Sequence, residues 1–134
     1  MALQYSEAVV NAKLDALETT IGTGAILKIR TGAAPANLAT ADSGSVLATL
    51  TLPSDWLAAA TGGAKAKAGT WQDTSADDSG TAQHFRIYAS DGTTKHIQGS
   101  VGVSATDMIV DSVSFTAGQS FTVSSFTITS GNYP

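Results

Sequence analysis

The chain lacks cysteine and is poor in charged residues. With no Cys among 134 residues, neither a disulfide framework nor a thiolate metal site can form. Only 13% of the residues are charged and the formal net charge is −4. A mildly acidic chain does not offer the basic surface that binds a phosphate backbone or an anionic membrane. We therefore expect neither a nucleic acid nor a membrane among its partners.

Long apolar runs are also missing, and none approaches the length that a transmembrane helix needs. The opening residues lack the basic stretch followed by an apolar stretch that marks a secretory signal, so we expect synthesis in a cytoplasm. Glutamate is limited to Glu7 and Glu18, whereas Ala, Thr, Ser and Gly dominate. This composition favours sheet over long helices, and the length fits one ordinary domain.

One helix is predicted near the N-terminus. Ser6 is a suitable N-cap, Glu7 suits the first turn, and Gly22 ends the pattern. Four apolar residues recur at helical spacing and form one stripe: Val10, Leu14, Leu17 and Ile21. The stripe must pack on something, either the chain's own sheet or a neighbouring subunit.

After residue 24 the pattern changes to that of strands. Residues 25–30, 46–52 and 64–71 read as strands, and residues 53–63 as a single helical turn capped by Ser54 or Asp55. The sequence predicts seven or eight short strands. We expect a mainly β protein, with residues 1–24 as N-terminal helix and linker and residues 25–134 as one antiparallel β-sandwich or barrel-like domain.

Residues 84–101 predict a hairpin around Asp91 and Gly92. A three-residue loop, 90–92, would pair Ala89 with Thr93 and place Gly92 in the left-handed conformation. The inward set would be Phe85, Ile87, Ile97 and Val101. The outward, polar set would be His84, Arg86, Tyr88, His96 and Gln98, so that both histidines share one face.

The C-terminal third alternates apolar and polar residues, but the parity slips. Phe121 and Val123 are odd, whereas Phe126 and Ile128 are even. A β-bulge at Ser124–Ser125 would place all four on one face. Without a bulge, one pair would point away from the core and form a contact surface.

We expect no catalytic, metal-binding or cofactor-binding residues, and no enzyme. His84 and His96 lack a third ligand at metal-binding spacing, and an open strand face does not enclose a reaction. The loop containing Asp73, Asp77 and Asp78 does not match the EF-hand pattern.

Trp56 and Trp71 allow two interpretations. Either they anchor the core, or, with Tyr88, they stack on a sugar in a carbohydrate-binding β-sandwich module.

Three stretches of the chain are similar to one group of proteins. They are MALQYSEAVVNAKLDALETTIGTGAILKIRTG, LATLTLPSDWLAAA with AKAGTWQD, and GTAQHFRIYASDGTTKHIQGSVG. Together they resemble small virion structural proteins of tailed bacteriophages, most of all capsid decoration (cement) proteins. The resemblance covers most of the chain and is weakest from Ser104 to Pro134.

The resemblance implies a non-enzymatic head decoration protein. Such a protein binds the major capsid protein on the outside of the shell, often as a homotrimer, and is added during assembly in the host cytoplasm. The alternative within the virion is a tail or fibre component. From the sequence itself we expect the partner contacts to come from the helix stripe and the polar hairpin face. These residues are Val10, Leu14, Leu17, Ile21, Arg86, Tyr88 and His96.

Overall fold

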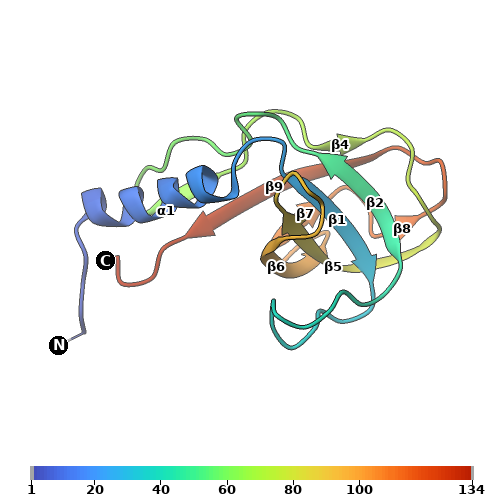
Figure 1. The fold of residues 1–134 in the computed structure, drawn as a ribbon, viewed down its shortest axis with the longest axis horizontal. Helices are drawn as coiled ribbons and strands as arrows, with labels where there is room; N and C mark the ends of the chain where they lie inside the picture. The colour runs from blue at the N-terminus through green and yellow to red at the C-terminus, as the bar shows by residue number, and fades with distance from the viewer. Residues whose placement is uncertain (1, 134) are drawn as a thin grey trace.

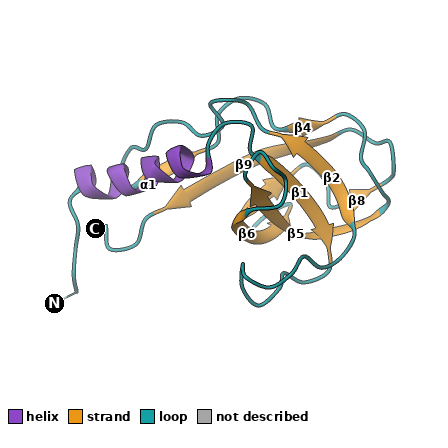
Figure 2. Ribbon diagram, in the orientation of Figure 1, coloured by secondary structure: helices purple, strands orange, loops and turns teal. Residues whose placement is uncertain are grey.

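The computed structural model describes residues 2–133. Over this range the chain forms one N-terminal helix followed by strands that make up most of the body (Figures 1 and 2). The elements are α1 (Glu7–Ile21), β1 (Ile26–Thr31), β2 (Val46–Thr51), β3 (Ala64–Ala66), β4 (Gln72–Asp73), β5 (Gly80–Tyr88), β6 (Lys95–Gly102), β7 (Met108–Val110), β8 (Ser114–Phe115) and β9 (Phe121–Thr129). The prediction of a mainly β protein with one N-terminal helix is confirmed.

The strands form one curled sheet in the order β2-β1-β5-β6-β7-β9-β3, to which β4 and β8 are attached through β9 and β5. All pairs are antiparallel except β6 with β7, which run parallel. The sheet is therefore mixed, not purely antiparallel as predicted. The parallel pair arises because the chain loops back after Gly102 and re-enters the sheet at Met108, beside Val101.

Helix α1 begins and ends where its sequence predicts. The Ser6 hydroxyl accepts a hydrogen bond from the backbone N–H of Val9 at 3.3 Å, and Gly22 ends the helix with a φ of 88°. Val10, Leu14 and Ile21 are buried, as a one-sided apolar stripe requires.

The segment between β2 and β3 is not the helical turn that the sequence predicts. Its backbone is held instead by Leu57, which bridges Lys67, and by a turn that pairs Thr61 with Ala64. Side chains of α1 accept hydrogen bonds from its N–H groups, so the segment needs no helical hydrogen bonds of its own. The four bonds join Leu57 to Glu18 (2.9 Å), Ala60 to Asp15 (2.9 Å), Gly62 to Glu7 (3.0 Å) and Gly63 to Asn11 (3.0 Å).

A row of aromatic rings runs through the core. Trp56 packs against Trp71, Trp71 against Phe126, and Phe126 edge-on against Phe85, with centroid separations of 6.0, 5.6 and 5.5 Å. Both indole N–H groups are bonded inside the protein, to Gly22 and Ala68 carbonyls, as buried tryptophans require. Trp56 and Trp71 are core anchors, so the interpretation that they form an exposed sugar platform is wrong.

The predicted bulge in β9 is confirmed. Phe126 pairs with Met108 and Ser125 with Ile109, but Val123 pairs with Val110, so Ser124 is the extra residue. The bulge turns both halves of β9 toward the core: Phe121, Val123 and Phe126 are buried, and Ile128 packs against them.

The predicted hairpin forms, with a different register. Ile87 pairs with Ile97 and Tyr88 with Lys95, so the three-residue loop and the pairing of Ala89 with Thr93 are wrong. The Ala89 N–H donates to the Thr94 carbonyl instead. The turn is held by the Asp91 carboxylate, which accepts from the N–H groups of Thr93 and Thr94. Gly92 is left-handed as predicted, with a φ of 71°.

Candidate functional site

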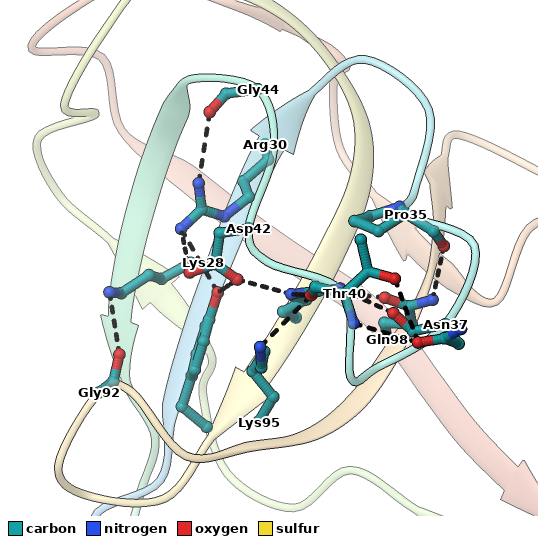
Figure 3. Close-up of polar contacts among 12 residues, drawn as sticks. Lys28, Arg30, Pro35, Asn37, Thr40, Asp42, Gly44, Gly92, Lys95 and Gln98 are labelled. Carbon is teal, nitrogen blue, oxygen red and sulfur yellow. Dashed lines mark hydrogen bonds and ion pairs between the residues drawn. The ribbon is translucent and has the colours of Figure 1, made fainter.

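The polar face of the hairpin does not face solvent. A long loop between β1 and β2, residues 32–45 and here called the strap loop, folds back over β5 and β6 (Figure 3). His84, Arg86 and Tyr88 lie beneath it and are 1%, 0% and 0% exposed. Connections of this length without secondary structure are uncommon in small domains, and this one is fastened along its length.

Arg86 makes the central attachment. Its guanidinium donates to the Asp42 carboxylate at 2.7 Å and to the carbonyls of Thr40 and Asn37 at 2.9 and 3.1 Å. Its Nε donates to the side-chain carbonyl of Gln98 at 3.0 Å. A buried guanidinium is tolerated only when it is paired and hydrogen-bonded in this way. Other attachments join the strap loop to the sheet: Arg30 to Gly44, Lys95 to Thr40, Gln98 to Pro35 and His84 to Gly32.

Asp42 connects three side chains of the sheet. It accepts from Arg86, from Arg30 at 3.1 Å and from the Tyr88 hydroxyl at 2.9 Å. Partial burial by itself would raise the pKa of the Asp42 carboxyl, but the hydrogen bonds from Arg86 and Tyr88 and the charge of Arg30 lower that pKa below 3.8. Burial and the bond to Asp42 raise the pKa of Tyr88 above 10.0. The carboxylate is therefore held in its charged form.

Two of the predicted contact residues are thus wrongly placed by the sequence pattern. Arg86 and Tyr88 alternate with inward-facing residues as predicted, but their face is covered by the chain's own strap loop. They cannot meet a partner while the strap loop is in place. The same covering removes Tyr88 as a stacking surface for a sugar.

The helix stripe also faces inward for most of its length. Val10 and Leu14 are buried within the chain, so the prediction that they contact a partner is wrong. Ile21 is 7% exposed and lines a hollow between α1 and β6. The inner side of α1 also holds a buried cation: Lys65 of β3 is 2% exposed and donates to Asp15 at 2.8 Å, and its Nζ lies 3.6 Å from a Glu18 carboxylate oxygen. The hydrogen bond from Lys65, together with that from the Ala60 N–H, lowers the pKa of Asp15.

Leu17 and His96 are the two predicted contact residues that remain near the surface, and the structure brings them together. They line a shallow hollow of about 170 Å³ between α1 and β6, here called the α1–β6 hollow. Its other lining residues are Lys13, Ala16, Thr20 and Ile21. His96 is the residue skipped where the β5–β6 register shifts. It lies beside the helix and not with His84, so the prediction that both histidines share one face is wrong.

A second hollow, of about 230 Å³, opens between β6 and β9 and is here called the β6–β9 groove. Its lining residues are Phe85, Ile97, Gln98, Asp107, Phe126, Thr127, Ile128 and Thr129. The sequence did not point to this groove, because it depends on β7 ending between two longer strands. The length of β7, three residues, is known only from the structure.

The acidic and histidine side chains of the described residues are spread over the molecule. Within residues 2–133, no three His, Cys, Asp or Glu side chains are grouped so as to hold a metal ion. In the acidic loop, Asp73 and Asp77 accept hydrogen bonds from the backbone and hydroxyl of Thr49, which ties the loop to β2. No helix in the described range combines the length and the apolar character needed to cross a membrane.

Comparisons of the chain with family models, with curated proteins and with solved structures find no match.

Proposed function

We propose that this chain is a non-enzymatic structural protein of a tailed-bacteriophage virion, most specifically a head decoration protein. It binds the major capsid protein on the outer surface of the assembled shell, as a homotrimer. A protein that binds only the assembled shell stabilises that shell by mass action. A closed trimer lets one small chain occupy many equivalent sites.

The proposal rests on the resemblance of three stretches, residues 1–32, 47–60 with 66–73, and 80–102, to small phage virion proteins. The structure supports a binding role over catalysis in one respect. The polar side chains that could have served as catalytic groups, Arg86, His84 and Tyr88, are used internally to hold the strap loop.

The contact surface we propose is the outer face of α1 together with the α1–β6 hollow. This face carries Leu17 and Lys13 at the hollow and continues to Val9, which is 45% exposed. Helical spacing places Val9, Lys13 and Leu17 in one row. An apolar row with one cation suits a partner surface with apolar and acidic groups.

The first experiment is the copy number of the protein in purified virions, measured by quantitative mass spectrometry against the major capsid protein. A ratio near one copy per capsid subunit supports decoration. A few copies per particle would place the protein in the tail or a fibre, and absence from the particles would refute a virion role.

A pair of leucine variants tests the contact surface. Leu17→Ser should keep the thermal stability close to that of the wild type and weaken binding of the purified protein to expanded capsids. Leu14→Ser is the matched control for the effect of an unstable fold. Leu14 is 4% exposed, so its replacement should lower the free energy of unfolding by about 2–4 kcal/mol. Unchanged capsid binding by a folded Leu17→Ser protein would show that the outer face of α1 is not the contact surface.

A further inference from the structure

The β6–β9 groove lies where β7 is shorter than the two strands beside it. Strand β7 has three residues, whereas its neighbours β6 and β9 have eight and nine. At β7 the two long strands are separated by two strand spacings, about 9.6 Å. Both continue past the start of β7, and both line the groove there. Before β7 the chain does not follow this path, because the Thr106 side chain lies beside Gly102 and Ala105 has a left-handed φ of 55°.

The register shows which backbone groups face the gap. Val101 of β6 lies opposite Met108, which in turn lies opposite Phe126 of β9. When the same register is extended past the start of β7, the vacant position lies between Gln98 of β6 and Thr129 of β9. One inserted residue would therefore have a strand edge on each side.

On β9, two hydrogen bonds on the side away from the groove show which way the backbone N–H and C=O groups point. The Phe126 carbonyl accepts from Lys67 at 2.8 Å, and the Ser130 N–H donates to the Gly63 carbonyl at 3.1 Å. Both bonds run toward β3. Because successive residues of a strand alternate in direction, the N–H and C=O of Thr129 point toward the groove.

On β6, the Ser100 N–H marks the outer edge. It donates across that edge to the Asp107 carboxylate at 2.8 Å, where a neighbouring strand would otherwise accept. Gln98 lies two residues away, so its N–H and C=O point the same way. Neither Gln98 nor Thr129 has a backbone partner on the groove side among residues 2–133.

The floor and the single charge define the chemistry of the ligand. The floor is apolar: Phe85 and Phe126 lie at its base and Ile97 and Ile128 at its sides. Asp107 is the one ionisable lining residue, and no Lys, Arg or His within residues 2–133 forms a salt bridge with it. The groove thus offers backbone hydrogen bonds on two sides, an apolar base and, at the end next to β7, the Asp107 carboxylate, which is hydrogen-bonded to Ser100 but has no counter-ion among residues 2–133.

We propose that the β6–β9 groove binds a short extended segment of another polypeptide as an added strand, with an apolar side chain on the floor and a Lys or Arg next to Asp107. Because β6 and β9 run antiparallel to each other, the added strand is parallel to one and antiparallel to the other. Main-chain hydrogen bonds supply affinity, and the floor and the charge supply selectivity. This proposal does not depend on a role in the virion.

The test uses the purified full chain and a synthetic octapeptide of alternating valine and threonine with a lysine at each end. Amide NMR follows a titration to about 1 mM, the concentration at which a weak peptide complex with a Kd of about 1 mM is half saturated. We expect shifts and slower hydrogen exchange at the amides of Gln98 and Thr129. The same peptide with glutamate ends should bind about threefold more weakly, the size expected for one exposed charge pair.

Two controls separate strand addition from adhesion to an apolar surface. A peptide methylated on every backbone nitrogen cannot donate and should not bind. Ile97→Lys should fill the groove and abolish binding, whereas Val113→Lys, at another half-buried residue packed on the core, should not. Absence of shifts at Gln98 and Thr129, or equal binding of the methylated peptide, would overturn the proposal. Neither result bears on the copy number in virions, so the two proposals fail independently.

Discussion

Arg86 and Asp42 form a hydrogen-bonded ion pair at 2.7 Å that joins the middle of β5 to a loop residue 44 positions earlier in the chain. The guanidinium is fully buried, whereas the carboxylate keeps 36% of its side-chain surface exposed. Loss of the ion pair would therefore cost Arg86 more than Asp42, because the buried guanidinium has no access to water and the carboxylate does. Arg30 depends on the same carboxylate. The strap loop thus contributes to the stability of the sheet that it covers.

Replacing Asp42 with alanine should destabilise the protein strongly. The change removes the counter-charge of two buried arginines, and uncompensated buried charges of this kind cost about 3 kcal/mol or more. The free energy of unfolding in urea measures the loss. Asp78→Ala is the matched control, because Asp78 is exposed and, among residues 2–133, its carboxylate accepts a hydrogen bond only from the N–H of Ser79. Equal stability of the two variants would show that the strap loop is not needed by the sheet.

The same carboxylate predicts sensitivity to acid. The pKa of Asp42 is lower in the folded protein than its ordinary 3.8, so its contribution to stability is complete above that pH. The contribution is lost as the pH falls from 3.8 through the folded-state pKa, because the unfolded chain then binds the proton first. The stability difference between wild type and Asp42→Ala should therefore narrow on acidification below pH 3.8. Thermal unfolding at a series of pH values measures it, and a gap that widens would contradict the assignment.

The buried Lys65 gives a third prediction, in which two variants behave differently. Lys65→Met keeps the volume and removes the buried charge, so we expect stability within about 1 kcal/mol of the wild type. Asp15→Ala leaves the ammonium with the Ala58 carbonyl and the more distant Glu18, and it removes the acceptor of the Ala60 N–H. It should cost about 1–3 kcal/mol. The free energies of unfolding of both variants in urea test this order. A greater loss of stability for Lys65→Met than for Asp15→Ala would contradict the prediction.

Deleting Ser124 should prevent the native fold. Without the extra residue, Phe126 and Ile128 would move to the opposite face of β9 while Phe121 and Val123 stayed in place, or the pairing with β7 would slip. We expect loss of the cooperative unfolding transition. Deletion of Ala33, an exposed residue of the strap loop, is the control and should fold. A Ser124-deleted protein that melts cooperatively near the wild-type temperature would show that the bulge is dispensable.

Several features could be predicted from the sequence because they depend on near neighbours. The helix ends follow from Ser6 and Gly22, whose capping bonds lie within one turn. The bulge at Ser124 follows from the parity of four apolar residues within one strand. The burial of the tryptophans was one of two interpretations, and it follows from the apolar area that each indole removes from water.

Which polar side chains are covered and which reach the surface was decided only by the tertiary structure. The pattern around Arg86 and Tyr88 correctly shows that they point away from Phe85, but alternation does not reveal what covers a face. The covering strap loop lies more than 40 residues away in sequence, and its attachment to Arg86 has no local signature. The burial of Lys65 has no local signature either, since its partners Asp15 and Glu18 come from α1. The β6–β9 groove exists because β7 ends early between two longer strands, and strand lengths and register are settled by the packing of the whole sheet.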